Sequence, residues 1–455
     1  MKINQLSYIT KFIILSLVIF ACEEEKNEEA AVVVEEEEEV IEEEEEDNSI
    51  STPTSYVFSS RFLDDGSSSV SYSGQTVRNL LLNDLKILTD SPSKSGGTAV
   101  TEESMLQLYD YDDSYDLTTR TSPDTPALES KYSSISTGKN LIGKMDSDVV
   151  IGYDKTADEL VKEWIAEIAS LSSNSDNLET HLAYTSAEGL NLSQMINKTL
   201  LGAVPYSQGT SNYLASLEDD GNAEAKSDGG SYSEMEHHWD EAFGYFGAAR
   251  DYNTGYSDDN DRKSGPYFDS NGDGAIDFKS EYNFGISVNA AKRDVGAADG
   301  QVDFTKVIFD AFLEGRTLIH NQAAISDILT QRDIIVNNWE KVIAATVVHY
   351  VNDCIADMTA LYESDSDAGP LSEGAATLNK HWGEMRGFTI ALQFNDFKLI
   401  SDADLKLLSD TMGLKPVYPA DGQSTFDDYK SALSTTVKNT LQSAYDFSDE
   451  NMAGW

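Results

Sequence analysis

The sequence predicts a mainly α-helical fold built of two helical bundles, and three observations lead to this prediction. Apolar residues recur at helical spacing through most of the chain after residue 54, whereas strand-like alternation is confined to the surroundings of Val57 and Tyr72. Clusters of Ser, Gly and Asp, typical of loops, separate the helical segments. An eight-residue pattern, H-W-x-E-x-x-G-aromatic, occurs twice, at 238–245 and 381–388. We call these two segments the first and second HWxE elements.

The helical segments can be justified in chain order. Residues 76–88 place Val77, Leu81 and Leu88 close to one face of a helix. Residues 156–171 follow Asp154 and Thr156, either of which is a suitable N-cap. Further helices are expected at 190–217, 233–248, 304–361, 376–397, 402–411 and 425–445.

One of these spans, 304–361, is too long for a single globular helix. We expect two or three helices there, with breaks near Asn321 and Asp333. The stretches 90–98, 110–126, 218–231 and 250–303 read as loops.

The two HWxE elements suggest an internal duplication. A weaker match precedes each of them, at 192–203 and 304–315, and the order is the same in both halves. We therefore expect related bundles at 54–250 and 303–455, joined by an acidic loop at 251–302 that carries a calcium-like motif.

The charge balance excludes some classes of partner. The 455 residues include 80 acidic and 32 basic ones, for a net charge of −48. Nucleic-acid binding requires clustered Lys and Arg, and docking on anionic lipid requires a basic patch. We expect neither.

The N-terminus predicts a lipid anchor. Residues 1–21 read as a signal peptide with a ten-residue apolar core at 12–21, too short to span a bilayer. Ala21 and Cys22 end this segment like a bacterial lipobox, so Cys22 is the expected lipidated residue. Glu23, Glu24 and Glu25 resemble an acidic surface-export signal, which indicates the outer face of the outer membrane. The Glu-rich stretch up to residue 53 is expected to be a disordered tether.

The HWxE elements are candidate transition-metal sites. A His and a Glu three residues apart project from one face of a helix, so His238 with Glu241, and His381 with Glu384, can converge on one ion. Imidazole and carboxylate together suit iron or zinc. The alternative is helix packing, in which the Trp belongs to the core, Gly244 and Gly387 permit close approach, and the His and Glu form a hydrogen bond.

Two strings and the lipobox support a resemblance to a protein family. HHWDEAFGYFG at 237–247 and GLNLSQMINKTLLGAVPYSQ at 189–208 resemble an uncharacterised family of bacterial lipoproteins, distantly similar to the imelysin-like proteins. The resemblance implies two duplicated helical bundles, a GxHxxE motif and a role in iron acquisition at the bacterial envelope. The motif's His and Glu fall on His238 and Glu241, whereas Glu236 and Asn379 stand where it has Gly.

A second motif, at 269–281, resembles a calcium-binding loop. Asp269, Asn271 and Asp273 supply oxygen atoms, Gly274 suits the sharp turn, and the Ala275 carbonyl occupies the seventh position. Asp277 and Glu281 complete the candidate ligands, although Glu281 stands one place later than the usual bidentate Glu. We expect calcium here, against the alternative of an Asp- and Gly-rich turn.

The sequence therefore predicts a surface lipoprotein that binds a metal or a metal chelate in envelope iron acquisition. The alternative is a nutrient-capture lipoprotein that holds a glycan or peptide for an outer-membrane transporter, with aromatic residues at 109–115 or 245–256 as a stacking surface. We expect a binding protein rather than an enzyme, because HExxH, G-x-S-x-G, P-loop and CxxC motifs are absent from the sequence.

Overall fold

The computed structural model describes residues 49–120, 130–218, 221–255, 262–263, 267–294 and 302–455. The predicted signal peptide, Cys22 and the Glu-rich part of the tether lie outside these residues. From residue 49 onward the described chain forms one compact unit. No described helix is both long and apolar enough to cross a membrane.

The prediction of a mainly α fold is confirmed. In chain order the described α-helices are α1 (Ser73–Asp90), α2 (Glu102–Tyr109), α3 (Tyr132–Ile135), α4 (Ala157–Ser173), α5 (Leu192–Leu201), α6 (Glu234–Phe246), α8 (Gly285–Asp294), α9 (Phe304–His320), α10 (Ile325–Ser364), α11 (Ala376–Ala391), α12 (Asp402–Met412), α13 (Gln423–Ala432), α14 (Lys438–Tyr445) and α15 (Asp449–Gly454). Extended pairing among the described residues is limited to isolated bridges such as Ser59 with Ser68.

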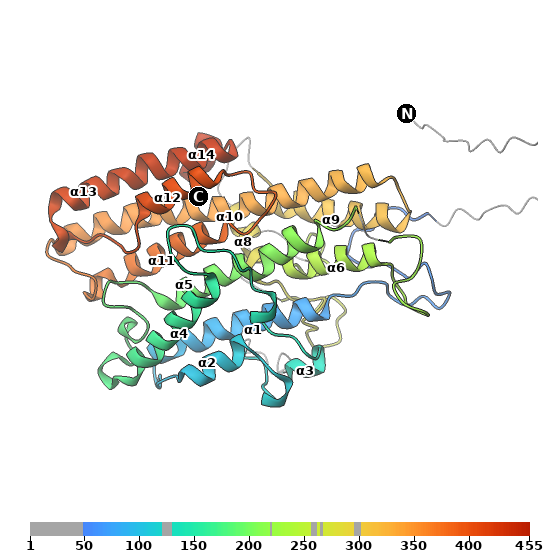
Figure 1. Cartoon of the computed structure of the whole chain (residues 1–455), viewed down its shortest axis with the longest axis horizontal. Helices are drawn as coiled ribbons and strands as arrows, with labels where there is room; N and C mark the ends of the chain where they lie inside the picture. The colour runs from blue at the N-terminus through green and yellow to red at the C-terminus, as the bar shows by residue number, and fades with distance from the viewer. Residues whose placement is uncertain (1–48, 121–129, 219–220, 256–261, 264–266, 295–301) are drawn as a thin grey trace, which may run out of the picture. The chain divides into compact units, whose positions relative to one another are not determined.

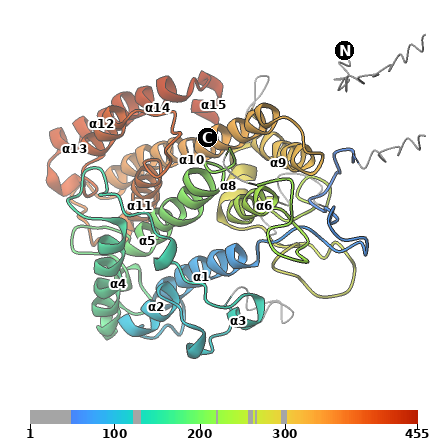
Figure 2. The same cartoon turned by 45° about the vertical axis from the view of Figure 1, so that its right-hand side comes forward.

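The helices form layers around α10 and α11. Helices α9 and α11 pack against α10, α5 packs against α11, and α1 and α4 pack against α5 (Figure 1). Helices α12 and α14 lie against the α10–α11 pair, while α2 covers α1 and α4 (Figure 2). Elements of both predicted bundles thus share one core, and their relation by duplication stays a prediction.

Local sequence signals explain where several helices begin and end. Thr156 is the N-cap of α4, where it forms a capping box with Glu159. Asn191 caps α5, its side chain accepting a hydrogen bond from the Gln194 N–H. After α5 the chain continues in π-helical turns at Gly202–Tyr206 and Gln208–Tyr213. Pro205 lies in the first of these turns and has no N–H to donate, which accounts for the departure from α geometry.

The long span at 304–361 is broken once rather than twice. Helix α9 ends at His320, as expected from Asn321, but α10 continues without interruption for 40 residues. The break near Asp333 was a wrong prediction. The α10 sequence contains no Gly or Pro, and Asp333 is exposed, so an acidic residue on the solvent side does not end the helix.

Two predicted boundaries also differ from the structure. The expected loop at 251–302 contains α8, whose Ile286, Ala290 and Ala291 are buried. The expected tether is ordered at its end, where the Ile50 N–H donates to Asn321 Oδ1 at 2.9 Å and Thr52 Oγ1 donates to Glu314 at 2.6 Å. The folded unit therefore begins before residue 54.

Candidate functional site

The first HWxE element lies on α6, where a capping box starts the helix. Ser233 Oγ accepts from the Glu236 N–H, and Glu236 Oε2 accepts from the Ser233 N–H. Glu236 and Asp240 also hold the buried Arg316 of α9, at 2.9 Å and 3.0 Å. Glu236, which stands where the GxHxxE motif has Gly, is thus part of a buried ion network that joins α6 to α9.

His238 and Glu241 have separate described partners on α6. His238 Nε2 lies 3.3 Å from Glu234 Oε1, while Glu241 Oε2 lies 3.6 Å from His237 Nε2. Glu241 Oε1 also accepts a 2.6 Å hydrogen bond from Gln75 Nε2 of α1. These are pairs four residues apart along the helix, rather than the predicted pair three apart.

The His and Glu of the second HWxE element, on α11, have partners from two other helices, α10 and α5. His381 Nδ1 lies 2.7 Å from Asp357 Oδ2 of α10. Glu384 accepts a 2.9 Å hydrogen bond from the Tyr350 hydroxyl and lies 3.0 Å from Lys380 Nζ and 3.6 Å from Lys198 Nζ of α5. This Glu is therefore held mainly by cations.

Across the described ranges, no group of three or more His, Cys, Asp or Glu side chains lies close enough together to hold a metal ion. The four residues of the HWxE elements are accounted for by local hydrogen bonds and ion pairs. Iron or zinc at His238, Glu241, His381 and Glu384 stays a prediction.

The loop at 269–281 adopts the sharp turn that its sequence predicts. Gly272 and Gly274 have positive φ angles of 72° and 83°, which only Gly adopts readily. Asp269 accepts hydrogen bonds from the N–H groups of Gly272 and Gly274, at 2.7 Å and 2.9 Å. Asn271 accepts from the Asp273 N–H and Asp273 from the Ala275 N–H, both at 2.8 Å.

Glu281, at the C-terminal end of this loop, accepts hydrogen bonds from the loop backbone. Glu281 is 2% exposed, and its carboxylate accepts from the N–H groups of Ser270 and Asp277 at 3.1 Å and 3.0 Å. The loop is thus already tied by its own backbone N–H groups, and calcium at Asp269, Asn271, Asp273, Ala275, Asp277 and Glu281 stays a prediction.

The proposed aromatic stacking surfaces are mostly inside the protein. Tyr109, Tyr111, Tyr245 and Tyr252 are buried, and Tyr256 lies outside the described residues. Tyr115 is 43% exposed, but it meets Tyr111 edge to face, with an interplanar angle of 73°. In the described part of these two stretches, Tyr115 is therefore the one exposed aromatic ring.

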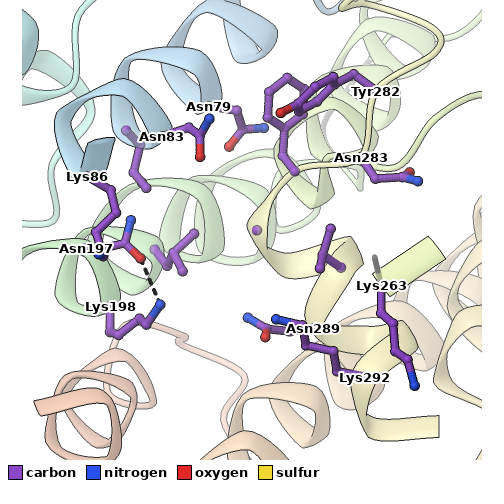
Figure 3. A pocket seen from close by; sticks show the side chains of 15 residues that line it. Asn79, Asn83, Lys86, Asn197, Lys198, Lys263, Tyr282, Asn283, Asn289 and Lys292 are labelled. Atoms are coloured by element: carbon purple, nitrogen blue, oxygen red, sulfur yellow. Dashed lines mark hydrogen bonds between the residues drawn. The ribbon is translucent and has the colours of Figure 1, made fainter. Parts of the chain in front are cut away.

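A pocket of about 360 Å³ lies between α1, α5 and α8 (Figure 3). Its described polar lining comprises Tyr282, four lysines and five asparagines, the last two groups being Lys86, Lys198, Lys263, Lys292, Asn79, Asn83, Asn197, Asn283 and Asn289. Among the residues that the structure describes, no Asp or Glu lines it. In a chain with 80 acidic and 32 basic residues, such a lining is unexpected.

Helical geometry explains how this lining forms. Asn79, Asn83 and Lys86 are spaced by four and three residues, so they share one face of α1. Asn289 and Lys292 share a face of α8 in the same way. Lys198 reaches the pocket from α5, with its Nζ 3.0 Å from Asn197 Oδ1 (Figure 3).

A protein-family model matches most of the chain. The model of the family described as Domain of unknown function (DUF4856) matches residues 53–381, which is more than half of the chain. The chain belongs to the DUF4856 family. No curated protein and no solved structure matches it. The matched region of this DUF4856 protein contains α1, α5 and α8, and therefore all three helical walls of the pocket.

The lysines of the DUF4856 pocket perturb one another. Burial lowers the pKa of Lys198 to about 8, the nearby cations Lys86, Lys292 and Lys380 lower it as well, and Glu384 opposes them. Partial burial also lowers the pKa of Lys292, together with Arg293, Lys380 and Lys263, again against Glu384. The lysines that line the pocket therefore repel one another, and Glu384, which is not among the lining residues, offsets this repulsion in part.

Sequence reasoning missed this pocket for two reasons. Lys86, Lys198 and Lys292 are about a hundred residues apart along the chain, and only the packing of α1, α5 and α8 brings them to one cavity. The last of them lies on α8, where the sequence predicted a loop. The available signal was the polar stripe of Asn79, Asn83 and Lys86 beside the apolar face of α1.

Proposed function

We propose that this DUF4856 protein is a lipid-anchored protein of the outer-membrane surface that captures a small solute and performs no chemistry on it. The pocket between α1, α5 and α8 is the observation that carries the proposal. Its volume of about 360 Å³ falls at the lower end of the range for small-molecule sites. Helices α1 and α5 pack against each other, and α8 packs against α9 and α10, so the helical walls of the pocket belong to the folded core.

In iron acquisition, the cargo of such a protein would be a metal chelate rather than a bare ion. Lysine ammonium and asparagine amide groups donate hydrogen bonds, so they suit the outer oxygen atoms of a chelate. The distant similarity to imelysin-like proteins supports the iron version of the proposal. An outer-membrane transporter is the partner that a surface-anchored capture protein of this kind would serve.

The alternative cargo, a glycan or peptide, would use the same pocket. The five asparagines favour it, because amide groups hydrogen-bond to hydroxyl and peptide groups alike. The buried tyrosines at 109–115 and 245–256 do not favour a glycan or peptide cargo.

We also propose calcium as a structural ion in the loop at 269–281. A cation that binds only the folded loop would stabilise the protein in proportion to its concentration. Millimolar calcium should then raise the melting temperature of the chain, and Asp273→Ala should remove this effect. An unchanged melting temperature in calcium, compared with a chelator, would contradict the proposal.

The capture function can be tested by native mass spectrometry of the full chain in detergent. The solutes are ferric citrate, uncomplexed iron and zinc, and a neutral oligosaccharide. Asn289→Trp fills the pocket from α8, and Ser326→Trp adds the same side chain at an exposed position of α10. We expect a solute adduct in the wild type and in Ser326→Trp that Asn289→Trp loses. A ferric citrate adduct supports the iron version, and an oligosaccharide adduct supports the alternative.

Two results would contradict the capture function. One is an adduct that persists in Asn289→Trp, which would place the site elsewhere. The other is binding of uncomplexed iron or zinc that is lost in a His238→Ala/Glu241→Ala variant, which would establish the HWxE metal site instead.

A further inference from the structure

We propose that the pocket between α1, α5 and α8 selects a small solute that carries at least two oxyanion groups, carboxylate or phosphate. The inference rests on the proposed capture function and specifies the chemical class of its ligand. The charge of the lining, the placement of the lysines and the ion pairs of Lys86 and Lys198 support it.

The charge of the lining favours an anion. Lys86 is paired with Asp90 and Lys198 with Glu384, and neither acid lines the pocket. Within the described part of the chain, Lys263 and Lys292 form no ion pair. Positive charge therefore exceeds negative charge at the cavity surface, and an oxyanion would relieve the repulsion between the lysines.

The placement of the lysines indicates more than one anionic group. Lys86 and Lys198 come from α1 and α5 on one side, whereas Lys292 comes from α8 on the other (Figure 3). A solute with one carboxylate can satisfy one side of the pocket only. A solute with two or more such groups can bridge the walls, while the asparagine amides between them donate to further oxygen atoms.

Lys198 is placed to change partners when the ligand binds. Its Nζ lies 3.6 Å from Glu384, a long distance for a charge-assisted hydrogen bond. Glu384 would not be left alone, because Tyr350 and Lys380 also hold it at 2.9 Å and 3.0 Å. Glu384 of the second HWxE element therefore holds Lys198 from outside the pocket lining.

The aromatic residues of the pocket do not favour a sugar. Tyr282 and Phe284 are 8% and 6% exposed, and their rings contact each other with centroids 4.7 Å apart. Their faces are thus occupied by protein, so stacking against a neutral ring has little surface to use.

Calorimetric titration of the full chain in detergent tests the inference. The probes are citrate with three carboxylates, pyrophosphate with two phosphates, acetate with one carboxylate, and neutral glucose. Lys198→Met and Lys292→Met each remove one pocket charge at nearly constant length. Lys406→Met is the matched control, because Lys406 is 65% exposed and pairs with Asp410 on α12.

We expect citrate or pyrophosphate to bind more tightly than acetate, and glucose not to bind. Each pocket variant should weaken binding by about tenfold or more, and the control by less than about twofold. Binding of citrate alone identifies a carboxylate ligand, and binding of pyrophosphate alone identifies a phosphate ligand. Thermal melts check that the variants fold, and Lys292→Met carries the test if Lys198→Met does not.

The pH dependence adds a second measurement on the same samples. The anion requires the protonated form of Lys198, which Glu384, Lys380, Lys86 and Lys292 surround. Affinity should therefore fall as the pH rises through about 8, and Lys198→Met should lose this decline.

The outcomes separate the inference from the proposed function. Glucose binding that Asn289→Trp abolishes and the lysine variants leave unchanged would overturn the inference and support the capture function. Equal affinities for acetate and citrate, or the absence of binding by all four probes, would overturn the inference, whereas the adduct screen decides the capture function.

Discussion

Helices α6 and α11 carry the same eight-residue pattern, and their environments can be compared position by position. Each buries its Trp and satisfies the indole N–H, Trp239 through the Phe312 carbonyl at 3.0 Å and Trp382 through the Tyr429 hydroxyl at 2.7 Å. Each also presents a Gly to a neighbouring helix. A Cβ at Gly244 would lie 2.6 Å from Tyr72 Cβ beside α1, and a Cβ at Gly387 would lie 2.6 Å from Lys198 Cβ on α5.

The polar positions differ between the two helices. The variable position is Asp240 in α6, buried against Arg316, and Gly383 in α11, which lies close to Asn191 and Gln194 of α5. Glu241 lies near Gln75 and His237, whereas Glu384 lies near Lys380 and Lys198. Trp and Gly thus explain the shared packing, and the elements differ in that Glu384 lies beside Lys198, a residue of the pocket lining.

The largest expected effect comes from breaking the buried ion network of α6, in which Arg316 of α9 holds Glu236 and Asp240. Arg316→Met leaves Glu236 and Asp240 buried without this cation, which should lower the free energy of unfolding by about 3–5 kcal/mol. Arg386→Met on α11 removes a cation whose described bonds are to Ser409 Oγ and a carbonyl group, so we expect about 1–2 kcal/mol. Urea unfolding of both variants measures the difference.

The pH dependence of this effect follows from Asp240. Burial raises the pKa of Asp240 to about 6 although Arg316 opposes it, so Arg316→Met should raise it further. The folded-state pKa lies above the ordinary value of 3.8 for an Asp side chain. Protonation then favours the folded state below this pKa, and the benefit is lost as the pH rises through it. The deficit of Arg316→Met should be smaller at about pH 5 than at pH 8, and a pH-independent deficit would contradict the assignment.

A smaller effect tests the close packing of Gly244 against Tyr72 and of Gly387 against Lys198. Gly244→Ala and Gly387→Ala each place a methyl group in contact with a neighbouring helix, which should cost about 1–3 kcal/mol by overpacking. Only Gly387→Ala should also weaken citrate binding, because it displaces Lys198. Thermal unfolding and calorimetry on the same two proteins check both statements. Equal binding by both variants would mean that α11 has no influence on the pocket.

The smallest expected effect is a change in citrate affinity when the Glu of an HWxE element, Glu384 or Glu241, is replaced by Gln. Glu384→Gln removes a negative charge beside Lys198 and should tighten citrate binding by a few-fold at about pH 6.5, where Lys198 remains protonated. Glu241→Gln is the matched control, since Gln75 is its described partner on α1. If Glu241→Gln tightened citrate binding as much as Glu384→Gln, the two HWxE elements would not differ in their effect on the pocket.

Much of the fold was predictable because its signals are local. Apolar spacing predicted α1 and α4, and Thr156 and Asn321 lie where α4 begins and α9 ends. The break near Asp333 failed because α10 has neither Gly nor Pro, and Asp333 itself is exposed. Helix α8 was missed because it is short and follows a stretch rich in Asp and Gly.

The candidate site was less predictable than the fold. The HWxE spacing correctly marked two helices, but their described His and Glu partners include Gln75, Tyr350 and Asp357, which the motif does not contain. The pocket depends on lysines from three helices, and no local pattern connects Lys86, Lys198 and Lys292. Such a site becomes visible only once tertiary packing is known.

The most direct measurement is the pKa of Lys198 in the free and the citrate-bound protein. NMR of isotopically labelled lysine side chains can follow it, with the signal assigned by its loss in Lys198→Met. The account predicts a pKa near 8 in the free protein, because burial and neighbouring cations lower it, and a clear rise when an anion binds beside the ammonium group. A pKa that citrate leaves unchanged would show that the pocket does not hold the anion at Lys198, and would contradict the account.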